Sequence, residues 1–354
     1  MKLFDTQVVF SLVCFVLVTN AVGAETVPCE PVGDMTPHCG FRNPEDLKKI
    51  PGHPVLVVSE MGEMVDPAAK GTLSVFEIEP PGRSEIAIDL SESPEIWADP
   101  SCPLPSHLNP HGIDLVERPD GRLALWVVNH GGRESIEVFE LSREDETWTA
   151  TWRGCAIPPG EPFLNDVAGL TDGGFVTTHM WDQGNSMIGV GLRFLLGMDT
   201  GFVWEWSPET GFAKLEGTDG SFPNGIAVSK DGRYLFVNRY MGGETTKYDR
   251  VAGETVAAVE IRQPDNVTID GEGHLWVPGH HQSMTSLDCG NGDGPCLWQY
   301  SVMRIDPSTM KGEVVIEHEG PPMGFATVAL VAGDTLYLGS ALGDRIVSMP
   351  VPGK

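Results

Sequence analysis

Residues 110–130 read PHGIDLVERPDGRLALWVVNH, and residues 223–238 read PNGIAVSKDGRYLFVN. Each stretch begins at a turn with a polar residue and glycine, continues as an apolar strand, passes an Asp-Gly turn, and returns as a second apolar strand. This pattern predicts a β-hairpin. Weaker copies occupy residues 164–178, 265–277 and 327–338, and an opening unit lies around residues 55–76.

The six copies recur at intervals of roughly 40 to 65 residues, which is in or near the range for propeller blades. A β-sandwich would have fewer and more closely spaced strands, and an α/β fold would need amphipathic helices between strands, which are almost absent. The sequence therefore predicts an all-β fold, a six-bladed β-propeller, with residues 25–354 as one domain.

One short helix is expected over one face of the propeller, at residues 187–198, MIGVGLRFLLGM. This segment is apolar on most sides, so packing against the propeller explains it. The alternatives are a lid over an active site and a helix that contacts lipid.

The composition favours a folded chain with an acidic surface. The 354 residues include 42 Gly and 28 Pro, and 41% are hydrophobic, which suits short strands joined by tight turns and is too apolar for disorder. The 50 acidic and 23 basic side chains give a formal charge of −27. Such a surface repels nucleic acid and anionic lipid headgroups, so we expect no nucleic-acid partner.

Residues 1–24 are typical of a signal peptide. Lys2 precedes an uncharged apolar run at residues 8–19, and Val22-Gly23-Ala24 is a small-residue cleavage site. We expect a secreted or periplasmic protein. An uncleaved membrane anchor is the alternative, because the run lies near the short limit for spanning a bilayer.

Removal of this leader would leave six cysteines, an even number that fits disulfides in an oxidising compartment. Cys289 and Cys296 flank a short loop that a disulfide would close, and Cys29 with Cys39 is a second candidate pair. The spacing leaves the full connectivity open. The sequence contains no Cys-x2-Cys pair, which argues against a metal-binding role for these thiols.

Polar residues recur at one position of the repeat, just before or at the start of the first apolar strand. In a propeller these strands line the central channel and begin at the same end of it, so their first side chains converge. The residues at this position are His111, Asn165, Asn224, Asp265 and Asn266.

Burying several amides and carboxylates together is costly unless a partner satisfies them, and a cation would do so. Oxygen ligands without thiolates select a hard ion, and calcium accepts six to eight of them in adaptable geometry. We therefore expect calcium at Asn165, Asn224, Asp265 and Asn266. Any one of these residues taken alone has a simpler explanation as a turn cap, and Asn266-Val267-Thr268 also fits a glycosylation site, which would need surface exposure.

Two histidines flank the second hairpin. His111 lies where its first strand begins and His130 follows its second strand, so both are expected at the channel mouth. Calcium polarises a carbonyl oxygen but acidifies water weakly, which makes a neighbouring imidazole useful as a general base. We assign proton acceptance to His111 and its orientation or proton relay to His130. A structural hydrogen-bonding role is the alternative for both.

These motifs resemble the paraoxonase family of calcium-dependent arylesterases and lactonases, which are six-bladed propellers. The resemblance runs in order from about residue 41 to about residue 350, and Ser340 also fits. Its motifs are PEDL at 44–47, NPHGI at 109–113, WVVNH at 126–130, LND at 164–166, FPNG at 222–225, DN at 265–266, LWV at 275–277 and TVA at 327–329.

The resemblance implies a fuller site than the repeat alone. It adds Glu45 as the fifth ligand of a catalytic calcium, and it implies a second, structural calcium held by Asp46, Asp166 and the backbone carbonyl of Ile113. It implies that His111 and His130 form a catalytic dyad and that residues 187–198 cover the site. The residues that it places in the substrate pocket are Phe222, His280 and Thr327.

The chain departs from the family at its termini. The family has a disulfide between the N-terminal segment and the last strand, but no cysteine follows Cys296 here. We therefore expect strand pairing to close the ring, with Cys29 bonded elsewhere.

Three hypotheses for function follow. The first is a calcium-dependent hydrolase of lactones or aryl esters, with His111 deprotonating the attacking water. The second is a sugar lactonase of the gluconolactonase and regucalcin type, against which the His111–His130 pair argues. The third is a non-catalytic binding module in which calcium serves stability alone.

Overall fold

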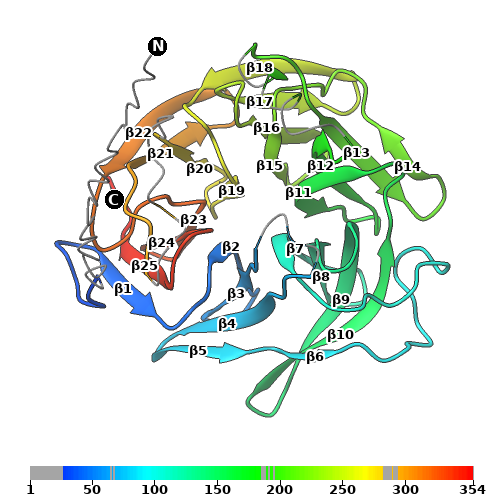
Figure 1. Ribbon diagram of the computed structural model, residues 1–354, viewed down its shortest axis with the longest axis horizontal. Helices are drawn as coiled ribbons and strands as arrows, with labels where there is room; N and C mark the ends of the chain where they lie inside the picture. The colour runs from blue at the N-terminus through cyan, green and yellow to red at the C-terminus, as the bar shows by residue number, and fades with distance from the viewer. Residues whose placement is uncertain are drawn as a thin grey trace, which may run out of the picture.

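The computed structural model describes residues 27–63, 66, 68–184, 189, 192–193, 196–281, 289 and 294–353. Their strands form six sheets arranged as blades around a central axis (Figure 1). The predicted all-β six-bladed propeller is confirmed. No helix among the described residues is long and apolar enough to cross a membrane.

Two predicted segments lie wholly or partly outside the described residues. The leader at residues 1–24 is outside them, and so are half of residues 187–198. Within that second segment Gly189, Leu192 and Arg193 have helical backbone, and Leu196 and Met198 are exposed. The helix over the site therefore stays a prediction.

In each of the first three blades the inner strand comes first in the chain, and later strands step outwards. The first blade contains β2 (Pro44–Lys49), β3 (Val55–Glu60), β4 (Thr72–Ile78) and β5 (Pro81–Glu85). The second contains β7 (Pro110–Glu117), β8 (Leu123–Asn129), β9 (Ser135–Glu144) and β10 (Thr147–Ala156), with β6 (Ala87–Asp89) parallel to β10 at the outer edge. The third contains β11 (Pro162–Gly169), β12 (Phe175–Asp182), β13 (Phe202–Ser207) and β14 (Gly211–Lys214).

The last three blades follow the same order, and the sixth takes its outer strand from the N-terminus. The fourth contains β15 (Pro223–Val228), β16 (Tyr234–Arg239), β17 (Glu244–Asp249) and β18 (Glu254–Glu260). The fifth contains β19 (Thr268–Ile269), β20 (Leu275–His280), β21 (Tyr300–Asp306) and β22 (Lys311–His318). The sixth contains β23 (Val328–Ala332), β24 (Thr335–Gly339), β25 (Arg345–Pro350) and β1 (Thr36–Cys39).

Buried apolar clusters lie between neighbouring blades. One joins the first and second blades through Val57 and Val127, and another joins the fifth and sixth through Val302 and Leu338. Burial of these side chains is the main free-energy gain that holds each blade against the next.

The hairpins expected from the repeat are the two innermost strands of the second to sixth blades. The first blade differs, because the opening unit at residues 55–76 supplies its second and third strands instead. Its inner strand is β2, whose sequence PEDLKK is polar. The repeat pattern therefore missed β2, although its motif is among those that carry the family resemblance.

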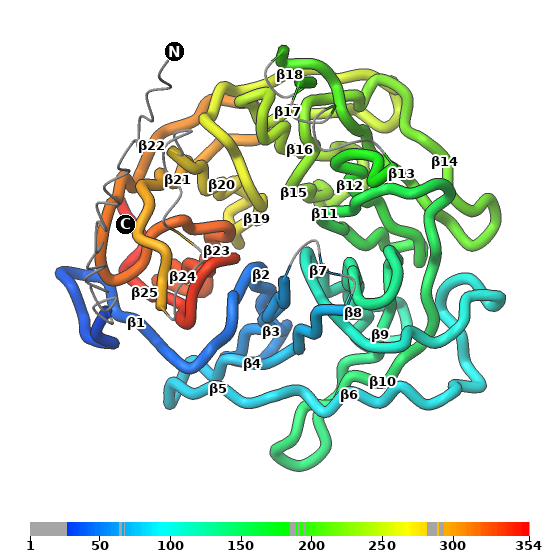
Figure 2. The backbone as a smooth tube through the Cα atoms, viewed as in Figure 1, coloured from blue at the N-terminus to red at the C-terminus, as the bar shows by residue number. Residues whose placement is uncertain are grey.

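Strand pairing closes the ring, as expected from the missing C-terminal cysteine. β1 pairs antiparallel with β25, with Thr36 opposite Ser348 and Cys39 opposite Arg345 (Figure 2). The guanidinium of Arg345 is buried and donates hydrogen bonds to the carbonyl oxygens of Val27 and Pro28 at 2.9 and 3.0 Å. The N-terminal segment is thereby attached to the last blade.

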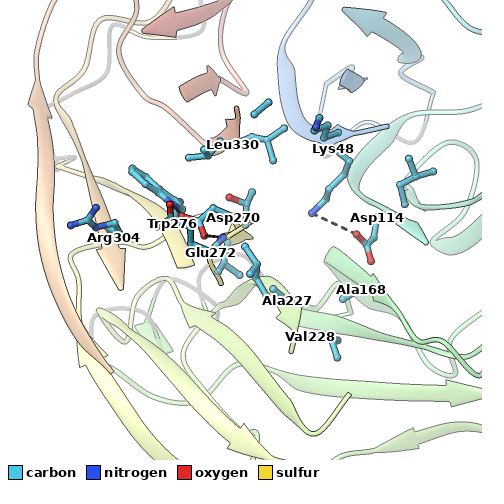
Figure 3. Close-up of a pocket in the computed structure, with 18 of the residues that line it drawn as sticks. Lys48, Asp114, Ala168, Ala227, Val228, Asp270, Glu272, Trp276, Arg304 and Leu330 are labelled. Atoms are coloured by element: carbon cyan, nitrogen blue, oxygen red, sulfur yellow. Dashed lines mark hydrogen bonds and ion pairs between the residues drawn. The ribbon is translucent and has the colours of Figure 1, made fainter. Parts of the chain in front are cut away.

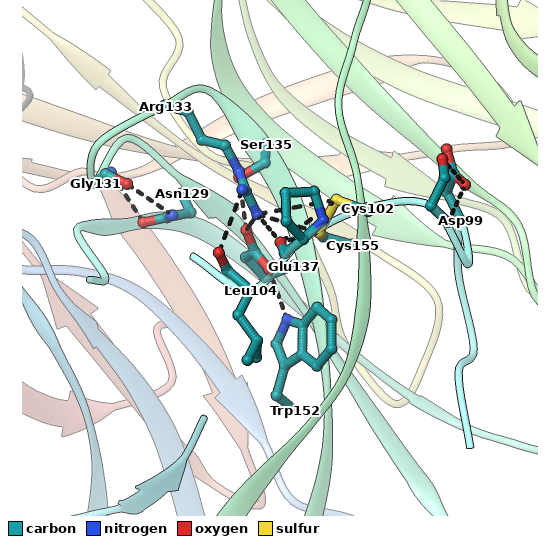
Figure 4. Close-up of a disulfide and its surroundings, with 12 residues drawn as sticks. Asp99, Cys102, Leu104, Asn129, Gly131, Arg133, Ser135, Glu137, Trp152 and Cys155 are labelled. Carbon is teal, nitrogen blue, oxygen red and sulfur yellow. Dashed lines mark hydrogen bonds and ion pairs between the residues drawn. A yellow bond between two sulfur atoms is a disulfide. The ribbon is translucent and has the colours of Figure 1, made fainter. Parts of the chain in front are cut away.

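Three disulfides use all six cysteines that follow residue 24. Cys29 pairs with Cys39 and Cys289 with Cys296, which agrees with the two candidate pairs. The third bond joins Cys102 to Cys155 on β10 (Figure 4). Arg133 lies beside this bond and contacts the buried carboxylate of Glu137 at 3.1 Å.

Candidate functional site

Four of the inner strands have a register shift near their starts, between Pro44 and Asp46 in β2, Pro110 and Ile113 in β7, Leu164 and Val167 in β11, and Pro223 and Ile226 in β15. Such a β-bulge interrupts the alternation of side chains, so two consecutive residues can be directed to the same side. The bulges provide this freedom at the channel end where the predicted site residues lie.

Two glycines let the inner strands approach one another at these bulges. A Cβ atom on Gly112 would collide with Asp166, and one on Gly225 would collide with the backbone of Asp265 and Asn266. The glycine in each Pro-x-Gly-Ile motif is therefore required by the contact between neighbouring blades.

The five predicted ligands of a catalytic calcium are buried side chains near or just before the starts of the inner strands, and we refer to them as the ring. Each is at most 7% exposed. Asn266 donates from Nδ2 to Glu45 Oε1 at 2.7 Å, and Asn224 donates to the carboxylate of Asp265. Asn165 Nδ2 contacts the sulfur of Met180 at 3.7 Å. The burial of Asn266 also disfavours its glycosylation.

Four oxygen atoms of this ring have no hydrogen-bond donor among the described residues. They are Glu45 Oε2, Asn165 Oδ1, Asn224 Oδ1 and Asn266 Oδ1. A buried acceptor without a partner costs about 1–3 kcal/mol, so four in one ring need an explanation. Three amide oxygens and a carboxylate oxygen form the donor set that a hard cation such as calcium prefers. The residues present therefore fit a calcium ion.

The two carboxylates of the ring are strongly perturbed. Burial raises the pKa of Glu45 well above its usual range, and the neighbouring charges of Asp46 and Asp265 raise it further. Burial also raises the pKa of Asp265 to about 8. A divalent cation between these groups would favour their ionised forms. Among the described residues, no group of three or more His, Cys, Asp or Glu side chains is placed to hold a metal ion. The ring has two such side chains, Glu45 and Asp265, and its other three members are amides.

His111 and His130 are adjacent, with 2.8 Å between His111 Nδ1 and His130 Nε2. Both are nearly inaccessible to solvent. Nε2 of His111 faces the ring at 3.7 Å from Glu45 Oε1. Burial lowers the pKa of His111 well below its usual range, with a smaller effect from His130. Burial therefore favours the neutral form of the His111 imidazole.

Asp46 and Asp166, predicted to hold a structural calcium with Ile113, are fully buried on the inner strands of the first and third blades, and Ile113 is on the inner strand between them. The backbone N–H of Ile113 donates to Asp46 Oδ2 at 2.9 Å, and that of Ile226 donates to Asp166 Oδ2 at 2.8 Å. Each carboxylate therefore links its own strand to the next one.

The predicted pocket residues have different surroundings. Phe222 is partly exposed, and its ring lies 5.8 Å from that of Trp181. Thr327 is buried and donates to the backbone carbonyl of Glu45 at 2.7 Å. His280 is fully buried, with Nε2 3.5 Å from Asp265 Oδ2. Thr327 and His280 therefore support ring residues directly.

The site includes residues that the sequence analysis missed. Glu134 accepts a hydrogen bond from His130 Nδ1 at 2.8 Å, and its other oxygen accepts from the backbone N–H of Leu164 at 3.2 Å. Its position four residues after His130 was the available signal. Tyr240 contacts His280 Nδ1 at 2.9 Å through its hydroxyl. Its role depends on contacts between distant segments, which no local motif reveals.

Fold and site together define a six-bladed β-propeller with a buried polar ring at one end of its channel and a histidine pair beside that ring. A family model described as arylesterase matches residues 71–346. The chain belongs to the arylesterase family.

Relatives with curated names support this assignment. Human serum paraoxonase/arylesterase 1 is 26% identical over 253 residues, and its mouse counterpart is 28% identical over 248 residues. Each match covers 66% of this chain and 66% of the relative. The match thus spans just under two thirds of the length of these relatives.

Solved structures share the fold at low sequence identity. A luciferin-regenerating enzyme has a TM-score of 0.53 at 14% identity, covering 89% of this chain and 93% of its own. A gluconolactonase from Xanthomonas campestris has a TM-score of 0.53 at 16% identity, covering 90% and 89%. These structures support the propeller architecture.

Proposed function

We propose that this protein is a calcium-dependent hydrolase that opens lactones or cleaves aryl esters at the polar ring. The observation that carries the proposal is the hydrogen-bonded series Glu134–His130–His111, whose last nitrogen faces the ring. A carboxylate, an orienting imidazole and a basic imidazole in sequence are the components of general-base catalysis.

The hydrogen bonds support one assignment of the basic nitrogen. The carboxylate of Glu134 accepts a hydrogen bond from His130 Nδ1–H, which leaves His130 Nε2 as an acceptor. His130 Nε2 then accepts from His111 Nδ1–H, so the lone pair of His111 lies on Nε2, directed to the ring. We assign to Nε2 the proton of a water molecule that attacks the substrate carbonyl.

The ring would supply the complementary charge. Calcium bound to Glu45, Asn165, Asn224, Asp265 and Asn266 would polarise the carbonyl oxygen of the substrate and stabilise the negative charge that develops on it. After the attack, His111 returns its proton to the leaving oxygen, which opens a lactone or releases an alcohol or phenol from an ester.

Aromatic side chains lie beside the dyad and support an apolar substrate. The rings of His130 and Phe163 are 4.5 Å apart, and those of Phe163 and Trp181 are stacked at 4.2 Å. Phe222 extends this row from Trp181. An aryl ester or an aliphatic lactone would gain contact area at the partly exposed end of this row, Trp181 and Phe222, whereas a polar sugar lactone would gain less.

The three disulfides support a second proposal, that the protein is secreted or periplasmic, because such bonds persist in oxidising compartments. Mass spectrometry of the mature N-terminus would test the proposed cleavage after Ala24. A membrane-bound protein that still begins at residue 1 would instead favour the uncleaved membrane anchor.

The test of function is a hydrolysis screen with calcium over aliphatic lactones, sugar lactones and aryl esters. We expect activity on at least one class, and we expect His111→Gln to lower kcat by about 10²-fold or more while retaining bound calcium. His53→Gln, at an exposed histidine, is the matched control and should keep full activity. An inactive wild type would favour the binding module, and full activity in His111→Gln would remove the dyad from the mechanism.

A further inference from the structure

Lys48 lies inside the central channel, further along β2 than the ring residue Glu45. After the bulge in β2 the ordinary alternation of side chains resumes, so Leu47 is buried in the blade with 0% exposure while Asp46 and Lys48 share the other side. Figure 3 shows the side chain of Lys48 extending from β2 towards Asp114 on β7. Its ammonium group thus lies among the inner strands.

A cavity of about 660 Å³ opens at this level. Its lining includes the later residues of the inner strands, such as Gly169 of β11 and Val228 of β15, whereas the ring residues lie at or before the strand starts. The cavity is therefore at the opposite end of the channel from the ring. Lys48 stands between the two.

The ammonium group is close to two carboxylates. Lys48 Nζ lies 3.8 Å from Asp46 Oδ2 and 4.0 Å from Asp114 Oδ1, and the side chain is 15% exposed. Asp166 also lies within electrostatic range of the same charge. Lys48 is thus a positive charge placed where the family resemblance implies a second calcium.

The carboxylates of Asp46 and Asp166 differ from the ring in their hydrogen bonding. Asp46 accepts from the backbone N–H groups of Leu47 and Ile113, and Asp166 accepts from those of Val167 and Ile226. None of their four oxygens is among the buried atoms without a partner, whereas four oxygens of the ring are. The ring therefore has oxygen atoms that an added cation would satisfy, whereas the carboxylates of Asp46 and Asp166 already have hydrogen-bond donors.

We propose that the ammonium group of Lys48 takes the place of the second, structural ion, so that the protein binds one calcium per chain. The inference rests on the proposed function in one respect, because the single ion is the one at the ring. A divalent ion on Asp46 would lie beside the ammonium group and be repelled by it. The lysine instead gives the buried carboxylates a counter-charge that no chelator removes.

The test is the number of calcium ions bound to the whole mature protein, measured by elemental analysis after equilibrium dialysis against calcium. We expect one ion per chain. Two ions would overturn the proposal. A protein that binds no calcium would contradict the calcium ring of the proposed function, although it would still agree with the absence of a second calcium site. Failure of this proposal and failure of the proposed function therefore give different ion counts.

Variants at two adjacent lysines provide a second readout. Lys48→Ala removes the ammonium group and its bulk, so we expect the stoichiometry to rise to two and the unfolding midpoint in calcium-free buffer to fall by several degrees. Lys49→Ala is the matched control, because Lys49 is an exposed neighbour on the same strand, and it should keep one ion and the wild-type midpoint. If Lys48→Ala behaves like Lys49→Ala in both measurements, the proposal is wrong.

Discussion

Glu134 illustrates how one side chain can set the chemistry of another. It accepts from His130 Nδ1 and thereby leaves His130 Nε2 free to accept from His111. In Glu134→Gln the amide can donate to His130 Nδ1, which favours the tautomer with a proton on Nε2. His111 would then lose its acceptor, although no atom that touches substrate has changed.

We expect Glu134→Gln to reduce kcat by about 10²-fold or more with little change in KM or in bound calcium, as measured by steady-state kinetics and metal analysis. Glu134→Asp should recover part of kcat because it restores a carboxylate. Glu146→Gln, at a side chain that is 93% exposed, should have no effect. A rise in KM with unchanged kcat would show that Glu134 supports substrate binding instead.

At the scale of single residues, the sequence predicted where a side chain lies in the fold better than it predicted which groups that side chain contacts. His111 and His130 were expected together at the channel mouth because the hairpin brings its two ends together, and they lie 2.8 Å apart. Lys48 was missed because the direction of its side chain depends on a bulge two residues earlier, and a bulge is a property of strand pairing. The catalytic roles of His111 and His130 and the metal-binding role of the ring stay predictions.

Among the elements, β1 closes the ring without a covalent bond to the last blade. The buried guanidinium of Arg345 on β25 strengthens this closure, because it donates to two backbone carbonyls of the N-terminal segment. Arg345→Met would leave those acceptors without their charged donor. We expect a loss of about 2–4 kcal/mol in the free energy of unfolding, measured with urea.

Arg304→Met is the control for Arg345→Met. Arg304 is on β21, is 31% exposed and pairs with the 71% exposed carboxylate of Glu313. Exposed pairs contribute little, so this change should alter the free energy of unfolding by less than about 1 kcal/mol. Equal losses in the two variants would show that the buried arginine has no special part in ring closure.

The sequence predicted the elements unevenly. Five blades had inner hairpins with apolar strands and a glycine turn, and these were found at the expected residues. β2 has no such signal, because four of its six residues are charged. β1 could not be located from its residues, since its pairing with β25 spans nearly the whole chain.

At the scale of the whole molecule, the ring depends on closure of the propeller. Glu45 is on the first blade, Asn165 and Asn224 on the third and fourth, and Asp265 and Asn266 directly before the fifth. Residues up to 221 positions apart therefore meet in one hydrogen bond, between Glu45 and Asn266. Repetition revealed four members of this ring, while Glu45 required the family resemblance, because β2 lacks the repeat pattern.

The most direct test of the account is hydrolysis measured before chelation, after complete removal of metal, and after addition of calcium or magnesium. The orphaned amide oxygens come from separate blades, and calcium adapts to such irregular sets better than magnesium, which demands a near-ideal octahedron. We predict that chelation abolishes hydrolysis, that calcium restores it, and that magnesium at the same concentration does not. Full activity in excess chelator, with no metal detected in the protein, would contradict the account.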